Sequence, residues 1–269
     1  MRSHGMTAPW MASTMRVLAG SFVVQAKDRV TSNFFIGTLF IQPVIFTVLA
    51  VGTYHYGGRP DFALYAVIGA GMIGIWNSNL WTSGRIVQDE RRAGTLALLL
   101  ASPTSLPLVL VGKSLSNALA SFIAVAITLL TGMLAFGVVP QFVDPLGFVL
   151  SLLLTLVAMT CLGLVLGPAF VLTRNTGDFI GVANYPIFIL SGLTFPLTLL
   201  PAWTRPLSSA LAPTWGNQAL NSALGMVETN PWAGYLWLIG LSVVYLLIAR
   251  LLFRKVEYLV RQAGSLEEW

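Results

Sequence analysis

The stretch LGFVLSLLLTLVAMTCLGLVLGPAFVL, residues 146–172, contains no charged side chain along its whole length. A helix needs only about 20 apolar residues to cross the hydrocarbon core of a bilayer. The rest of the chain has the same character, because 56% of its 269 residues are hydrophobic and only 9% are charged. A soluble domain usually carries about 25% charged residues. The composition therefore predicts an all-α polytopic membrane protein.

Six apolar segments are long enough to form transmembrane helices. They cover residues 33–54, 62–81, 106–137, 146–172, 179–200 and 232–252. Together they define a transmembrane domain over residues 33–252, between a cytoplasmic N-terminal segment, 1–32, and a cytoplasmic tail, 253–269. The stretch after the fifth segment is interrupted by Pro201, Pro206 and Pro213. This spacing favours short helices, so we expect a re-entrant helical hairpin over residues 195–225 rather than a seventh span.

The basic residues indicate which ends of the segments face the cytoplasm. With the N-terminus inside, thirteen of the fifteen bases fall on the inner side and only Arg59 and Arg205 on the outer side. Such an asymmetry is the positive-inside pattern of membrane proteins, so both termini are predicted to be cytoplasmic. The net charge of +5 comes from the ends of apolar runs and not from a basic face. A nucleic-acid partner is therefore not expected.

A further helix is predicted ahead of the first span. Met11, Met15, Leu18 and Phe22 recur at helical spacing, while polar residues occupy other sides of the same stretch. This pattern is typical of an interfacial helix that lies along the inner leaflet. Such a helix either anchors the chain or braces a cytoplasmic partner, and the sequence leaves both roles open.

The loop over residues 82–105 is unusually charged for this chain. Arg85, Asp89, Glu90, Arg91 and Arg92 place five charges in eight positions. A helix-like apolar continuation follows, and it suits a surface on which charges fix the register of a partner and leucines are buried. An ordinary solvated loop with weak surface ion pairs is the alternative.

Two motifs carry a resemblance to a known family. The first is Glu90-Arg91-x-x-Gly94-Thr95, followed by Leu96-x-x-Leu99-Leu100 and Ser102-Pro103. The second is Leu190-Ser191-Gly192-x-x-Phe195-Pro196, followed by Pro201 and Pro213-Thr214. Both resemble ABC type-two permeases, the membrane subunits of drug, lipid and polysaccharide exporters, including daunorubicin-resistance-like permeases. The likeness extends along nearly the whole chain.

The resemblance implies that the charged loop contains a cytoplasmic coupling helix. Its contacts with a separate ABC ATPase subunit would be made by Arg85, Gln88, Asp89, Glu90, Arg91, Arg92, Gly94 and Thr95. The partner subunit would bind ATP and Mg, and this chain would hold no cofactor. The triplet Gly112-Lys113-Ser114 is not a phosphate loop, because such a loop needs a glycine where this chain has Pro107. A second permease copy or related permease, and membrane lipids, would complete the assembly in the cytoplasmic (inner) membrane of a prokaryote.

Two further groups of residues are candidates for the transport route. A substrate path is predicted from polar and aromatic residues in or near the spans: Gln42, Trp76, Asn77, Asn79, Asn184, Tyr185 and Phe188. Hydrogen bonding between helices is the plainer interpretation of the polar ones. By resemblance, an outer gate would comprise Ser191, Gly192, Phe195, Pro196, Pro201 and Pro213.

The predicted function is that of a permease subunit of an ATP-driven exporter, moving hydrophobic or amphipathic cargo such as drugs or lipids, as in multidrug efflux. The chain itself is not expected to be an enzyme. No metal site is expected, because His4 and His55 are far apart in the sequence. The alternative is an integral-membrane enzyme or accessory protein that binds a soluble partner through its charged loop. A proton-coupled transporter is less favoured, because the spans are nearly free of ionisable residues.

Overall fold

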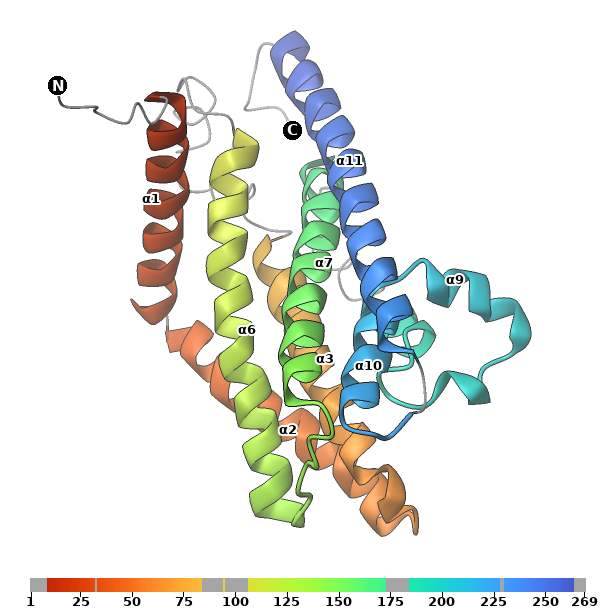
Figure 1. Ribbon diagram of the computed structural model, residues 1–269. Coiled ribbons are helices and arrows are strands. Elements are labelled where there is room, and N and C mark those ends of the chain that lie inside the picture. The colour runs from red at the N-terminus through yellow and green to blue at the C-terminus, as the bar shows by residue number, and fades with distance from the viewer. Residues whose placement is uncertain are drawn as a thin grey trace, which may run out of the picture.

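The computed structural model describes residues 9–31, 33–83, 94, 106–172, 184–227 and 230–263, and the regular elements in these ranges are helices. The predicted all-α class is therefore confirmed. Figure 1 shows long helices packed beside one another, most of them roughly aligned and the second running obliquely to the rest. They are α1 (Pro9–Thr31), α2 (Asn33–Tyr56), α3 (Ala63–Ser83), α6 (Leu106–Phe136), α7 (Pro145–Leu172) and α11 (Pro231–Ala263).

In the described part of the chain, four helices contain stretches long and apolar enough to cross a membrane. The stretches are Leu39–Tyr56, Val111–Phe136, Pro145–Gly167 and Pro231–Lys255. They coincide with the first, third, fourth and sixth predicted segments. The second predicted segment coincides with α3. Helix α3 is not one of the four candidate spans, because the polar residues Asn77 and Asn79 in its last turns lower its mean hydropathy. The fifth lies partly outside the described residues, so the count of six spans stays a prediction.

The fifth predicted segment, 179–200, is wrong as a single continuous helix. Helical structure covers residues 184–190 and gives way to a turn at Ser191 and Gly192. The turn is followed by two 3₁₀ turns, η2 (Leu197–Leu199) and η3 (Ala202–Thr204), and by the short α9 (Arg205–Ser209). The longer α10 (Ala212–Ala223) completes this region and is largely buried. The short helices agree with the proline-rich sequence, since proline ends a helix that precedes it.

The N-terminal helix differs from its predicted placement along a membrane surface. In Figure 1, α1 runs beside the first half of α6 with nearly the same direction, and the two helices are in contact. A Cβ atom added at Gly112 would lie 2.8 Å from the carbonyl oxygen of Leu18 and 2.9 Å from Ser21 Cβ. The lack of a side chain at Gly112 and the small one at Ser21 therefore let the two backbones approach closely.

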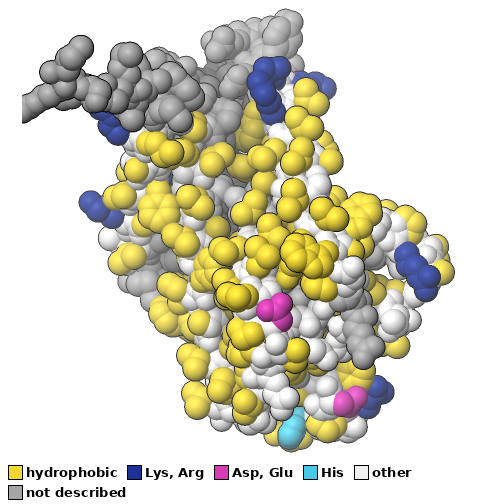
Figure 2. All heavy atoms as spheres, viewed as in Figure 1, with side chains coloured by type: hydrophobic (Ala, Val, Ile, Leu, Met, Phe, Trp, Pro, Cys, Tyr) yellow, Lys and Arg dark blue, Asp and Glu magenta, His cyan; other side chains and the backbone are white. Residues whose placement is uncertain are grey.

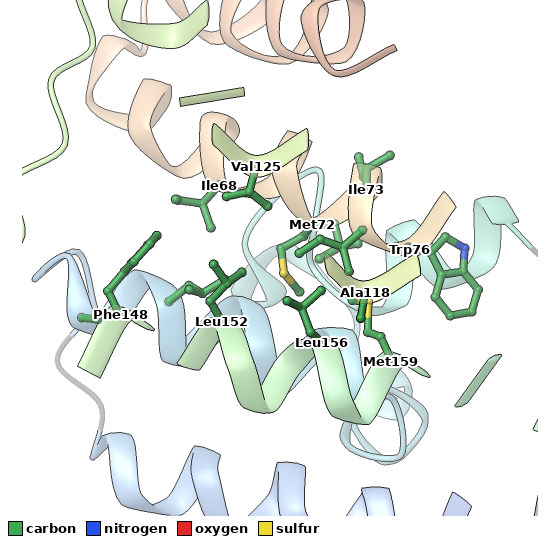
Figure 3. Packing of buried hydrophobic residues seen from close by; sticks show 14 of the residues in the cluster. Ile68, Met72, Ile73, Trp76, Ala118, Val125, Phe148, Leu152, Leu156 and Met159 are labelled. Carbon is green, nitrogen blue, oxygen red and sulfur yellow. The ribbon is translucent and has the colours of Figure 1, made fainter. Parts of the chain in front are cut away.

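Helix α3 lies inside the bundle. Its residues Met72, Ile75 and Trp76 are at most 1% exposed, and they pack against α6 on one side and α7 on another. Figure 3 shows this layer, in which Met72 and Trp76 lie close to Leu156 and Met159 of α7. The core is therefore organised around α3, which is enclosed by neighbouring helices.

The outward faces of the long helices are apolar instead of polar. Leu134 of α6, Leu236 and Leu251 of α11 and Leu146 of α7 are between 65% and 86% exposed. Figure 2 shows hydrophobic side chains over most of the middle of this face, while Lys and Arg side chains lie mainly near its margins. An apolar exterior of this kind belongs in lipid, since a soluble monomer rarely exposes so large an apolar patch.

Replacing Met72 by Ala should destabilise the bundle. Lipid is as apolar as this core, so the main cost is the cavity that the shorter side chain leaves, on the order of 2 kcal/mol. Thermal unfolding in detergent should show a lower midpoint for Met72→Ala. The matched change Leu236→Ala, at a position 70% exposed, should leave the midpoint close to that of the wild type. Equal midpoints for Met72→Ala and wild type would contradict the central position of α3.

Candidate functional site

The candidate site is the helix break, which we define as residues 191–194. Gly192 has a φ of 68°, a left-handed conformation that glycine adopts without the strain that a side chain would bring. The amide of Gly192 donates to the carbonyl of Ile189 at 3.2 Å, and the amide of Leu193 donates to the carbonyl of Phe188 at 3.2 Å. These bonds close the preceding helix and turn the chain away from its axis.

Side chains from three other helices hold the carbonyl groups of the helix break. The Tyr65 hydroxyl of α3 donates a hydrogen bond to the carbonyl oxygen of Gly192. Asn217 Nδ2 of α10 donates to the same oxygen at 2.8 Å and to the Tyr65 hydroxyl at 3.0 Å. The Tyr54 hydroxyl of α2 donates to the carbonyl of Thr194 at 2.8 Å. We call Tyr54, Tyr65 and Asn217 the carbonyl clamp.

The helix break also lies directly on α3. A Cβ atom added at Gly69 would collide with the carbonyl oxygen of Leu193. Gly69 follows Tyr65 by one helical turn, so the two residues lie on the same side of α3. One turn of α3 therefore supplies both a hydrogen-bond donor and the space for close backbone contact.

Further polar groups in this region are buried. Asn221 lies one turn beyond Asn217 in α10, and its Nδ2 donates to Asn217 Oδ1 at 3.0 Å and to the Asn217 carbonyl at 2.7 Å. Within the described part of the chain, Ser191 Oγ and Thr194 Oγ1 are buried without a hydrogen-bond partner. Most buried polar groups in proteins are hydrogen-bonded, so these two hydroxyls differ from the Gly192 and Thr194 carbonyl groups, which have partners.

The residues predicted for a substrate path are not gathered around one cavity. Trp76 Nε1 donates to Asn184 Oδ1 at 2.7 Å, and Asn79 Oδ1 accepts from Thr160 Oγ1 at 3.3 Å. These bonds connect separate helical segments, as the plainer interpretation expected. Tyr185 is 71% exposed, whereas Asn77 is 5% exposed. The remaining two residues predicted for the substrate path also differ in exposure, since Gln42 is half-buried and Phe188 packs against the core.

An apolar cavity between α3, α6, α7 and α10 has a volume of only about 10 Å³ and includes Met72, Phe148 and Leu220 in its lining. That volume is close to the minimum for one water molecule. A site for a drug-sized molecule usually measures about 300 to 1,000 Å³. This cavity therefore belongs to the packing of the bundle, and the role of the substrate-path residues stays a prediction.

The residues predicted for an outer gate are divided by the structure. Ser191, Gly192 and Pro213 are buried at the helix break and at the start of α10. Phe195 and Pro196 are partly buried beside them, and Pro201 is exposed. Two of the predicted gate residues, Ser191 and Gly192, thus belong to the helix break. The role of the predicted gate residues in gating remains a prediction.

The residues predicted to contact an ATPase lie outside the described residues, except Gly94. Gly94 forms a turn with a φ of 69°, which suits glycine better than any other residue. The contacts of Arg85, Gln88, Asp89, Glu90, Arg91, Arg92 and Thr95 stay predictions.

Sequence reasoning missed the carbonyl clamp. Tyr54 and Tyr65 lie in different apolar segments, and nothing in their spacing connects them to Gly192. The pair Asn217 and Asn221 does carry a signal, because residues four apart share one face of a helix. Two amides on one face of a short helix in an apolar chain indicate a buried partner.

These features define a helical membrane protein whose centre contains an interrupted helix and a short buried helix. The chain belongs to the ABC-2 type transporter family, which it matches over residues 15–224. That range contains the charged loop, the helix break and all of α10. The chain is thus the permease component of an ABC transporter and is not itself an ATPase. No curated protein matches the chain.

The carbonyl clamp can be tested with an isosteric change. Asn217→Asp replaces the Nδ2 donor by an oxygen that faces the Gly192 carbonyl, so a donor–acceptor pair becomes two acceptors. Leaving buried polar groups unsatisfied costs about 1 to 3 kcal/mol, and the midpoint of thermal unfolding in detergent should fall. Asn230→Asp is the matched control, because Asn230 is exposed and its Oδ1 accepts from the Trp232 amide at 3.1 Å. A fall of equal size in both variants would argue against the clamp.

Proposed function

We propose that the chain is the permease subunit of an ATP-driven exporter of hydrophobic or amphipathic cargo, drug-like or lipid-like, in the inner membrane of a prokaryote. A separate ATPase subunit binds ATP and Mg and docks on the charged loop. A second permease copy or a related permease completes the transport path. The observation that carries this proposal is the family match over residues 15–224, which includes the two motifs that resemble exporter permeases.

The position of α3 supports coupling between the charged loop and the helix break. Helix α3 ends at Ser83, two residues before Arg85, and carries Tyr65 and Gly69 near its other end. The distance along the helix from Tyr65 to Ser83 is about 27 Å. A packed helix moves as a largely rigid element, so a displacement at the loop would reach the helix break through α3.

The direction of the helices supports cytoplasmic termini. The first turn of α1 and the last turns of α11 lie at the same end of the molecule in Figure 1. The exposed bases Arg250, Arg254 and Lys255 are at that end of α11. Arg59 follows α2 at the opposite end, where it pairs with Asp61 at 3.6 Å. Three bases near one end agree with the positive-inside rule.

Transport requires two arrangements of the permease that the ATPase contacts differently. In the proposed cycle, ATP binding closes the ATPase pair and displaces the charged loop. Movement of α3 then alters the hydrogen bonds of the carbonyl clamp and opens the outer gate. The buried hydroxyls of Ser191 and Thr194 are available to pair in the second arrangement.

The cargo is inferred from the chemistry of the spans. The described candidate spans are apolar, and ionisable residues that would mark an ion route are nearly absent from their sequences. An apolar or amphipathic molecule driven by an external motor fits these spans. An accessory protein or integral-membrane enzyme has no comparable support, since the family assignment defines a permease component.

The test is co-purification of an ATPase with the full-length chain from its native membranes in mild detergent. The wild type should capture a nucleotide-binding subunit, and the double variant Glu90→Arg with Arg91→Glu should capture several-fold less. Reversal of both charges keeps the net charge of the loop. It would also place a like charge opposite each partner group that Glu90 or Arg91 contacts.

A matched control reverses a pair on the opposite side of the membrane. Arg59 and Asp61 form an exposed ion pair, so Arg59→Asp with Asp61→Arg also keeps the net charge. This control should capture as much ATPase as the wild type. Normal capture and transport by the Glu90 and Arg91 variant would refute the docking site, and no captured ATPase with wild type would refute the exporter.

A further inference from the structure

The inference concerns an outward stripe of α11, which we define as Leu236, Val243, Leu247, Arg250 and Arg254. These positions follow one another at intervals of seven, four, three and four residues, so they lie on one side of the helix within about 60° of each other. The three apolar members are 70%, 52% and 56% exposed, and both arginines are exposed as well. The stripe is therefore an apolar surface that ends in two guanidinium groups.

The stripe faces away from the protein. The other side of α11, which carries Leu238, Tyr245 and Ala249, is at most 7% exposed at these residues and packs against α7 and α10. Figure 2 shows basic side chains near the last turns of α11 and hydrophobic side chains along the surface below them. The stripe therefore belongs to the lipid-facing exterior of the bundle.

The two arginines lie at the depth of lipid headgroups. Trp232, near the start of α11, is 68% exposed, and exposed tryptophan in membrane helices is enriched at the boundary between hydrocarbon and headgroups. Along the helix, Arg250 lies about 27 Å and Arg254 about 33 Å beyond Trp232. Since the hydrocarbon core is about 30 Å thick, the two guanidinium groups lie on either side of its other boundary.

The protein supplies no counter-charge for these arginines within its described part. Of the acidic residues whose side chains the structure describes, Asp61 is already in an ion pair, and Asp144 precedes α7 at the end where α11 begins. Asp28 lies on α1, across the bundle from α11 in Figure 1. Neither α7 nor α10, the helices packed against α11, contains a charged residue. A charge that borders hydrocarbon is disfavoured without a partner, so the partner must come from outside these helices.

We propose that the arginine end of the stripe binds the phosphate of an anionic phospholipid, whose acyl chain lies along the apolar part of the stripe. A guanidinium group presents paired N–H donors that match phosphate oxygens. Arg250 and Arg254 are one helical turn apart, so both reach the same headgroup. Val243 precedes Arg250 by about 10 Å, less than the roughly 15 Å of hydrocarbon in one leaflet, so one acyl chain covers both Val243 and Leu247.

This site differs from a topology signal. The positive-inside rule depends on how many bases lie at one end of a span, whereas the lipid site depends on their place on the lipid-facing side of α11. A lipid with a net negative charge is preferred to a zwitterionic one, because two arginines attract it more strongly. The proposal goes beyond the proposed function and does not rest on it.

The experiment uses the full-length chain in phosphatidylcholine vesicles, with its single cysteine, Cys161, replaced by serine. A fluorophore is attached at Leu247→Cys, beside the arginines, or at Leu236→Cys, on the same face 11 residues earlier. Added lipids carry a quenching nitroxide on the acyl chain and have either a phosphatidylglycerol or a phosphatidylcholine headgroup. Phosphatidylglycerol should quench several-fold more effectively than phosphatidylcholine at Leu247→Cys, and the two lipids should quench equally at Leu236→Cys.

Charge variants then test the arginines. Arg250→Gln with Arg254→Gln should remove the preference for phosphatidylglycerol at Leu247→Cys. The matched control is Arg59→Gln with Arg205→Gln, which lowers the net charge equally at two other exposed bases and should keep the preference. Glycerol phosphate in solution, which has the phosphate without acyl chains, should not compete. Native mass spectrometry of the chain with Cys161 intact should show the same difference between the two double variants in bound phosphatidylglycerol.

Equal quenching by the two lipids at Leu247→Cys would overturn the proposal. An equal loss of preference in both double variants would also overturn it, since overall charge would then attract the lipid. Weak quenching by both lipids at Leu247→Cys would mean that protein covers the stripe, and competition by glycerol phosphate would mean that the site takes a soluble phosphate; either result contradicts a lipid site. These measurements need neither an ATPase nor transport, so their failure leaves the proposed function untouched.

Discussion

The structure depends on one buried acceptor, the carbonyl oxygen of Gly192. Breaking a helix within an apolar bundle releases backbone groups that neither lipid nor apolar side chains can satisfy. Tyr65 and Asn217 satisfy this oxygen together, so α3 and α10 are joined through a carbonyl group that belongs to neither. Removing the break would remove the reason for α10 to be buried and for tyrosine to interrupt the apolar surface of α3.

Helix α3 meets two opposite packing requirements. It has no side chain at Gly69, where the backbone of Leu193 approaches closely, and it has large side chains at Met72 and Trp76, which fill the core. Its final turns must also tolerate Asn77 and Asn79 at the end that leads to the charged loop. A helix enclosed by protein can carry a polar residue such as Asn79 because a neighbouring helix supplies a partner, here Thr160 of α7.

The sequence was sufficient for the helical membrane class and for most long helices, because long apolar runs leave few alternatives. It also indicated short helices at Pro201, Pro206 and Pro213, since proline limits helix length locally. It was insufficient for the point where the fifth segment ends and for the direction of α1. The first depends on contacts between Gly192 and residues far away in sequence, and the second on close approach at Gly112. Contacts between distant segments set both features, and amphipathic spacing carries no information on them.

Helices α10 and α11 also share an aromatic contact. The rings of Trp215 and Trp237 stack with centroids 5.1 Å apart and an interplanar angle of 7°. Two indoles so close couple their electronic transitions, which makes their near-ultraviolet circular dichroism depend on mutual orientation. The protein therefore contains an intrinsic optical reporter of whether its buried short helix shifts against the last span, readable without any attached probe.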